Sequence, residues 1–312
     1  MSVRQITNTI LMIRPVGFRM NEETAINNYF QEEVALTKEN VNTQAQKEFD
    51  TFVEKLRAVG VRVIVEDDVL ENDTPDSIFP NNWVSFHKSG TVGLYPMFAE
   101  NRRRERREEI MDRLEEEGFV INAFMDYTSA EDEEVFLEGT GSILIDRENK
   151  KAYCALSPRA DEDLFIEFCE DFECDPVVFT ANQTVNDTRM PIYHTNVMMA
   201  LGEHLAVICL DAIDDKKERK GVIRQIRETK KEILEITEAQ MHQFAGNMLQ
   251  VLGVNDKRYM VMSTAAHESL RPDQIKMIEK YSEILSSDLT IIETCGGGSA
   301  RCMMAEVFLP KN

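Results

Sequence analysis

Short β-rich segments alternate with amphipathic helical segments along the whole 312-residue chain, and this alternation constrains the fold more than any other feature. The unit is two strands, a helix and one more strand, and it recurs about every 60 residues. No Gly-, Ser- or Pro-rich linker interrupts the series. The pattern predicts a single α/β domain over residues 1–312, with units arranged as a ring or propeller whose polar residues converge on a central axis.

The expected helices hold apolar residues three and four positions apart among charged ones, whereas the expected strands are short runs bounded by turn residues. Helices are expected at 41–58, 102–117, 161–171, 217–245 and 271–286. Strands are expected at 7–14, 61–66, 83–87, 91–95, 119–123, 142–146, 151–155, 176–179, 197–200, 205–209, 259–262, 289–292 and 302–308. The sixteen methionines are expected mainly in the strand core.

Acidic residues outnumber basic ones by 56 to 35, which gives a formal net charge of −21. Binding a polyanion requires a basic face, so we expect no nucleic-acid partner. The one basic run, residues 101–118, has acids interleaved at helical spacing and is interpreted as a solvated helix face. No apolar stretch approaches the roughly 18–20 residues that span a bilayer, so we expect no membrane association and a cytoplasmic protein.

The six cysteines are sparse and show no C-x-x-C pairing, so we expect reduced thiols and no zinc site. His267-Glu268 lacks the second histidine that a helical zinc motif needs. The run "CGGGSA" at 295–300 lacks the Lys-Ser/Thr ending of a loop that binds nucleotide phosphates. We therefore expect neither a metal nor a cofactor.

Four stretches place polar residues where a core strand would favour apolar ones. They are "SIFPNNWVSF" (77–86), "VFLEGTGSILI" (135–145), "IYHTNVMMAL" (192–201) and "IIETCGGGSARCMMAEV" (291–307). Each has a structural alternative: Asn81 and Asn82 can form an Asx turn, Glu138 can end a strand, and His194 can be a core histidine bonded to a carbonyl. For each of these residues considered alone, the structural interpretation is favoured over a functional one.

Taken together, a Cys, a His and a Glu beside glycines are the parts of a nucleophilic site. A thiol needs a nearby cation or backbone amides to ionise at neutral pH. Glycines 296–298 would let the backbone approach a substrate and leave amides free to face developing negative charge. Histidine supplies proton transfer, and the glutamate orients a cationic or N–H-bearing neighbour.

The motifs "FPNN" (79–82), "LEGTG" (137–141) with "LSPRAD" (156–161), "HTN" (194–196) and "GGSARCM" (297–303) together resemble the amidinotransferase, or pentein, superfamily. Arginine deiminases, dimethylarginine hydrolases and glycine amidinotransferases belong to that group. The resemblance covers essentially the whole chain in the family's order. It implies a five-bladed α/β propeller of ββαβ modules with the active site at its centre.

The resemblance also implies roles for individual residues. Cys302 matches the nucleophile, so Cys295 is expected to be structural. His194 matches the general acid and base, and Glu138 matches the acid that orients the histidine. Arg159 falls where relatives bind the substrate carboxylate, and one of the arginines at 102–104 is a second candidate. Arg301 is a weaker candidate, and Phe79 of the first motif is expected to contact substrate.

Two departures from the family pattern bear on the substrate. Arginine deiminases carry an aspartate in the first motif and another two residues after the histidine, whereas the matching positions here are Asn82 and Asn196. An amide offers a donor and an acceptor and suits a neutral ureido group better than a guanidinium. We therefore expect a hydrolase that attacks the ureido carbon of L-citrulline or a close analogue, giving ornithine, carbon dioxide and ammonia through a covalent cysteine intermediate.

Three alternatives stay open. They are an arginine deiminase or other guanidine hydrolase, an amidinotransferase, and a non-catalytic pentein that acts as a binding module. The expected partner is a small amino-acid substrate, and a homodimer is possible. Either 14–40 or 126–136 is expected to form the lid over the site.

Overall fold

The computed structural model describes residues 4–311, and within them it contains five three-stranded sheets and one two-stranded sheet. Each three-stranded sheet has the same build. In one of them β6 (Ile143–Asp146) pairs antiparallel with β7 (Lys151–Leu156), and β7 pairs parallel with β8 (Asp175–Thr180). Helix α5 (Glu162–Asp171) connects the parallel pair, because parallel neighbours need a crossover.

The other four sheets repeat this ββαβ order, and the last is assembled from both ends of the chain: its C-terminal strand pairs antiparallel with β1. One module consists of β3 (Val84–Phe86), β4 (Thr91–Leu94), α3 (Glu108–Glu116) and β5 (Ala123–Asp126), and another of β11 (Met199–Leu201), β12 (Leu205–Ile208), α7 (Lys216–Glu228) and β13 (Glu232–Glu235). A further module consists of β14 (Leu249–Leu252), β15 (Arg258–Ser263), α10 (Pro272–Glu279) and β16 (Glu283–Ser287). The module that joins both chain ends consists of β17 (Ala305–Glu306), β1 (Thr9–Arg14), α2 (Lys38–Ala58) and β2 (Arg62–Asp67).

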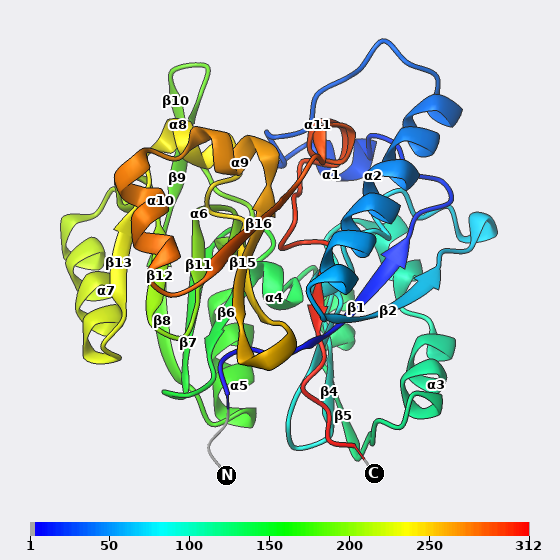
Figure 1. Ribbon diagram of the computed structural model, residues 1–312, viewed down its shortest axis with the longest axis horizontal. Coiled ribbons are helices and arrows are strands. Elements are labelled where there is room, and N and C mark those ends of the chain that lie inside the picture. Colours follow the sequence, from blue (N-terminus) through cyan, green and yellow to red (C-terminus); the bar gives the residue numbers. More distant parts are fainter. Residues whose placement is uncertain (1–3, 312) are drawn as a thin grey trace.

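Short helices and one hairpin complete the chain. In Figure 1, α7 and α3 lie at opposite edges, α4 lies between them, and the hairpin projects from the top. The short helices are α1 (Glu22–Ala25), α4 (Gly139–Ser142), α6 (Thr195–Met198), α8 (Glu238–Met241), α9 (Thr264–Ser269) and α11 (Thr290–Gly296). The hairpin consists of the strands β9 (Asn182–Val185) and β10 (Thr188–Pro191). The structure is therefore an α/β fold of repeated modules. Their arrangement as five propeller blades stays a prediction.

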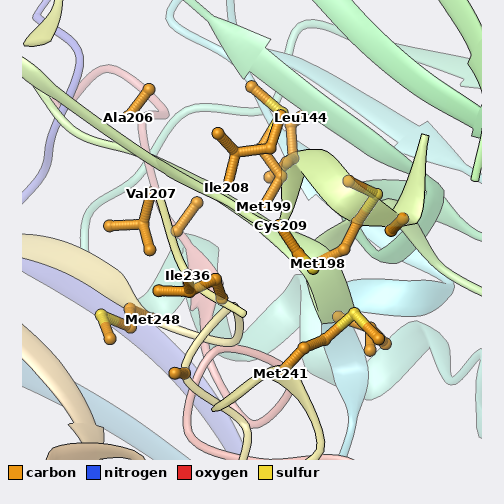
Figure 2. Packing of buried hydrophobic residues seen from close by; sticks show 14 of the residues in the cluster. Leu144, Met198, Met199, Ala206, Val207, Ile208, Cys209, Ile236, Met241 and Met248 are labelled. Carbon is orange, nitrogen blue, oxygen red and sulfur yellow. The ribbon is translucent and has the colours of Figure 1, made fainter. Parts of the chain in front are cut away.

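The core follows the strands. Figure 2 shows part of the largest cluster, where Met198, Met199, Met241 and Met248 pack with Ile208 and its neighbours. All four methionine side chains are buried, but only Met199 lies in a strand, so the expected strand location holds for one of the four. Unbranched, polarisable side chains fill irregular spaces between sheets, which explains their number here.

Several sequence-based assignments are wrong; the strand expected at 119–123, for example, overlaps β5 at Ala123 only. The helix expected at 217–245 ends at Glu228, because Lys230 takes a positive φ of 61° and residues 232–235 add as β13 to the neighbouring strand. The helix expected at 271–286 gives way to β16 at Glu283. The strand expected at 289–292 is instead the start of α11.

None of the helices in residues 4–311 combines the length and apolar character that a bilayer crossing requires.

Candidate active site

Two of the polar motifs contain very short helices, and the residues just before these helices bring their side chains into contact. Glu138 is the N-cap of α4 and His194 is the N-cap of α6. Gly139 has a φ of +44°, and a Cβ there would lie 2.6 Å from the carbonyl oxygen of Asn81. A side chain at Gly139 is therefore excluded both by conformation and by the close approach of the 80–82 turn.

The motifs line one small, buried cavity. Its lining consists of Asn28, Asp76, Phe79, Asn82, Arg102, Arg159, Tyr193, His194, Gly296, Gly298 and Cys302. Glu138 lies directly behind His194, and Asn196 lies beside Cys302. The structure thus brings together Cys302, His194, Glu138, Asn82, Asn196, Arg159 and Phe79.

His194 and Glu138 form a buried pair, with 2.7 Å between Nε2 and Oε2. The other Glu138 oxygen accepts a hydrogen bond from the Phe98 backbone N–H at 3.0 Å. Burial opposes the charge on Glu138, but the Arg159 guanidinium and the His194 bond outweigh it and lower the pKa of Glu138 to about 2. Burial lowers the pKa of His194 to about 4 despite the attraction of Glu138. A neutral His194 that donates from Nε2 keeps Nδ1 able to accept a proton.

The Cys302 thiol is 3% exposed and lies between two asparagine amides. The Nδ2 of Asn196 is 3.4 Å from Sγ, and the Nδ2 of Asn247 is 3.2 Å from it. Sequence reasoning predicted Asn196 and missed Asn247. Asn247 follows Gly246 just before β14, outside every motif, and only its position in the folded chain relates it to the site.

Arg102 is the arginine of the 102–104 run that lines the cavity. Its guanidinium donates to Asn82 Oδ1 at 2.8 Å and pairs with both oxygens of Glu105 at 2.8 and 3.0 Å. Arg103 and Arg104 bond to backbone carbonyls elsewhere. The guanidinium of Arg102 therefore holds the side chain of Asn82, the last residue of the "FPNN" motif.

Arg159 is also buried, at 1% exposed, and its Nη1 lies 3.5 Å from Glu138 Oε2. It donates to Asn27 Oδ1 and to the Thr24 carbonyl, each at 2.9 Å, and lies over the Tyr193 ring. Two guanidinium groups thus face a cavity that also holds the thiol.

Asp76 is a buried carboxylate of the cavity that sequence reasoning missed. Its Oδ2 accepts from Asn21 Nδ2 at 2.8 Å and from Thr24 Oγ1 at 3.1 Å, whereas its buried Oδ1 has no protein partner. Burial raises its pKa, against the attraction of Arg102. The signal available was its place immediately before the polar stretch 77–86 that contains the "FPNN" motif.

Of the remaining candidates, Phe79 lines the cavity, whereas Cys295 and Arg301 do not. The Phe79 ring packs so closely on the glycine loop that a Cβ at Gly296 or Gly298 would come within 2.8 or 2.9 Å of it. Cys295 is buried in α11 and does not line the cavity, and Arg301 turns away to the Met304 carbonyl and Glu306.

Of the two lid segments, the one within 14–40 covers the site. Asn21, Thr24 and Asn27 bond to cavity residues, and Asn28 Nδ2 donates to the Gly296 carbonyl at 3.2 Å. Residues 126–136 do not line the cavity.

Comparisons with known proteins identify the family and the fold. The family model described as N,N dimethylarginine dimethylhydrolase, eukaryotic, matches residues 14–309. The fold is similar to that of ArgZ, an arginine dihydrolase from the ornithine-ammonia cycle in cyanobacteria, with a TM-score of 0.72, 17% identity, and coverage of 97% of this chain and 41% of ArgZ. The fold is also similar to that of AgrE bound to ornithine and NAD+, with a TM-score of 0.74, 16% identity, and coverage of 97% of this chain and 40% of AgrE.

A dimethylarginine dimethylaminohydrolase adduct with S-methyl-L-thiocitrulline gives a TM-score of 0.63 at 15% identity, covering 96% of this chain and 99% of that protein. The chain spans about two fifths of the length of ArgZ and AgrE. No curated protein sequence matches it. At these identities the solved structures establish the shared fold.

Proposed function

The chain belongs to the dimethylarginine dimethylhydrolase family of pentein proteins, and we propose that it is a cysteine-dependent hydrolase that converts L-arginine, through citrulline, into ornithine, carbon dioxide and ammonia. One observation carries the proposal: a buried thiol, a His–Glu pair and two amides share a cavity with two guanidinium groups and an aspartate. Those groups supply both the chemistry and the recognition that an α-amino acid requires.

Recognition of the amino-acid end rests on opposite charges. Arg159 and Arg102 are suited to the substrate carboxylate, because a guanidinium presents paired donors. The unpartnered Oδ1 of Asp76 is suited to the α-ammonium, and a cation there would favour the ionised carboxylate against its burial. Phe79 and the glycine loop would pack on the aliphatic stem.

The charges of the site favour a cation over a neutral substrate. Counted in their ionised forms, the three buried carboxylates Asp76, Glu105 and Glu138 outnumber the two buried guanidinium groups by one, an excess of one negative charge before the thiol ionises. L-arginine carries one net positive charge and would balance it, whereas citrulline carries none. Asn82 and Asn196 still suit the ureido group, so both steps fit one site when arginine enters first and citrulline is the intermediate.

In the first step neutral His194 takes the thiol proton, and Cys302 Sγ attacks the guanidino carbon while a C=N π pair moves onto nitrogen. The imidazolium gives its proton to a terminal nitrogen, ammonia leaves, and an amidino-thioester remains. Water then loses a proton to His194 and adds to the same carbon. The C–S bond breaks and releases citrulline.

In the second step Sγ attacks the ureido carbon of citrulline, and the carbonyl π pair moves onto oxygen. Amide N–H groups of Asn196, Asn82 and the glycine loop are suited to stabilise that oxyanion. Protonated His194 gives its proton to the substrate Nδ, so ornithine leaves and a carbamoyl-thioester remains. Water releases carbamate, which decomposes to carbon dioxide and ammonia.

ArgZ is an arginine dihydrolase and AgrE forms a complex with ornithine, and both support this choice by analogy. The single catalytic domain over 1–312, the five-bladed propeller, the cytoplasmic location and the homodimer remain predictions that accompany the proposal.

The test is product analysis of purified protein with L-arginine and L-citrulline in separate reactions, with Cys302→Ala as control. We expect two ammonia per ornithine from arginine, one per ornithine from citrulline, and neither product from the variant. Citrulline that accumulates without ornithine would indicate an arginine deiminase. Ornithine from citrulline alone would restore the narrower citrulline hydrolase predicted from Asn82 and Asn196.

A further inference from the structure

We propose that Asn247 is a catalytic residue that holds the Cys302 thiol in position and stabilises negative charge on its sulfur. The inference rests on the proposed function only in taking Cys302 as the nucleophile. No sequence motif contains Asn247, and the inference comes entirely from where the folded chain places its amide.

Asn247 is 1% exposed, and all of its hydrogen bonds except one local backbone bond are made to the nucleophile and its neighbours. Nδ2 donates to Cys302 Sγ at 3.2 Å and to the Asn196 carbonyl at 2.9 Å. Oδ1 accepts from the Cys302 backbone N–H at 3.4 Å. The backbone carbonyl of Asn247 accepts from the Arg301 N–H, also at 3.4 Å.

These partners fix the orientation of the amide. The Asn196 carbonyl can only accept and the Cys302 N–H can only donate, so the nitrogen of Asn247 must face Asn196 and its oxygen must face the Cys302 backbone. The second hydrogen of Nδ2 is then directed toward Sγ. A donor, rather than an acceptor, is therefore held against the thiol.

The local sequence explains how an asparagine reaches this position. The turn after α8 bends at Phe244, whose φ is +60°, and the Asn247 N–H closes the turn on the Phe244 carbonyl at 2.9 Å. The residue just before Asn247, Gly246, packs its backbone on α6: a Cβ there would lie 2.2 Å from the Val197 carbonyl oxygen. Only glycine allows this approach, which sets Asn247 beside Asn196 and Cys302.

Two N–H donors thus converge on Sγ from separate modules, one from Asn196 and one from Asn247. A hydrogen bond to a charged acceptor is stronger than one to a neutral acceptor, so these N–H donors are suited to stabilise negative charge that develops on Sγ. Neither arginine of the cavity forms a hydrogen bond or ion pair with Sγ among the described residues. The amides therefore supply stabilisation that a neighbouring cation supplies in other thiolate sites.

The test is the rate at which iodoacetamide alkylates Cys302 at pH 7.5, followed by mass spectrometry of the Cys302 peptide. This readout needs no substrate. Asn247→Asp preserves the size of the side chain and replaces the donor with a negative charge, and Asn247→Ser provides a second variant if the aspartate prevents folding. Cys302→Ala gives the background from the other cysteines. Gln250→Glu is the matched control, because it makes the same amide-to-carboxylate change at a residue 2% exposed and outside the cavity.

We expect Asn247→Asp to alkylate about tenfold or more slowly than the wild type, in line with loss of a hydrogen bond to a charged group. Turnover of arginine should lose kcat with little change in KM, since Asn247 does not face the amino-acid end. Alkylation of a folded Asn247→Asp protein within twofold of the wild type would overturn the inference. If the wild type turns over neither arginine nor citrulline while the variant still alkylates slowly, the inference stands and the proposed function falls.

Discussion

At the scale of single residues, Asp76 is the side chain whose proposed role separates binding from chemistry most cleanly. Asp76 lines the cavity with its Oδ1 unpartnered, and its other oxygen is already held by Asn21 and Thr24. Asp76→Asn preserves the shape and removes the charge. We expect KM for arginine to rise about 10- to 100-fold, the effect of losing one charge-assisted hydrogen bond, with kcat much less affected.

An arginine analogue without the α-amino group, 5-guanidinopentanoate, is the control for this change. The wild type should discriminate against the analogue, and Asp76→Asn should discriminate much less, because the group that Asp76 binds is missing already. Steady-state kinetics of both proteins with both compounds give the interaction energy directly. Equal discrimination by the two proteins would show that Asp76 does not bind the ammonium.

Residue types and order led to Cys302, His194 and Glu138 because nucleophiles, acids and bases carry recognisable motifs. Asp76 and Asn247 carry none: each is an ordinary polar residue whose importance depends on what the fold sets opposite it. The prediction that citrulline is the substrate was limited in the same way, because it did not include residues outside the motifs. It followed from Asn82 and Asn196 alone, and the total charge of the site depends on buried residues from several modules.

At the scale of secondary structure, α11 shows why local patterns fail near the site. Its first residues, Thr290 to Ile292, are β-branched and were expected to form a strand. The helix begins there because both carboxylate oxygens of Glu48, in α2, accept the Ile291 and Ile292 N–H groups at 2.9 and 3.0 Å. A partner 243 residues away from Ile291 thus accepts two N–H groups of the first turn of the helix, and no local window contains it.

The same helix carries a carboxylate that should make stability depend on pH. Glu293 accepts a hydrogen bond from Ser299 in the loop before Cys302, and burial raises its pKa to about 7, against the hydrogen bonds of Ser263 and Ser299 and with Glu48 and Asp288 nearby. A folded-state pKa above the unfolded value means that this contribution is fully present below about pH 4.5 and is lost as the pH rises through about 7.

We expect Glu293→Gln, which retains an acceptor for Ser299 without a titrating group, to flatten the loss of stability between pH 5 and 8. At pH 8 the variant should gain up to about 3 kcal/mol relative to the wild type. Urea denaturation across that range measures the effect, with Glu283→Gln on the exposed face as control. Parallel stability curves for wild type and variant would show that Glu293 does not titrate in this way.

At the scale of the whole molecule, the ββαβ recurrence correctly predicted an α/β fold of repeated modules. It did not show how the chain ends meet. Leu11 in β1 pairs with Ala305 in β17, and the Val307 N–H donates to the Thr9 carbonyl at 2.9 Å. Contacts between residues almost 300 positions apart have no periodic signal, so the sequence could suggest a ring only by counting units.

The C-terminal segment joins two modules, and Leu309 tests how much the whole fold depends on that junction. Leu309 is 5% exposed in a cluster with Leu11 of one sheet and Trp83 and Val84 of the next. Leu309→Ala should lower the free energy of unfolding by about 2–5 kcal/mol, the usual cost of such a cavity. Leu70→Ala, at a leucine 66% exposed, should change it by less than about 0.5 kcal/mol.

Because the junction is shared by sheets from both ends of the chain, one cooperative transition should simply move to lower urea concentration when Leu309 is truncated. Tryptophan fluorescence and circular dichroism would follow it, since the single tryptophan, Trp83, lies in the same cluster. Two separate transitions, with fluorescence changing before the circular dichroism, would mean that the modules unfold independently and that the chain ends do not unite them.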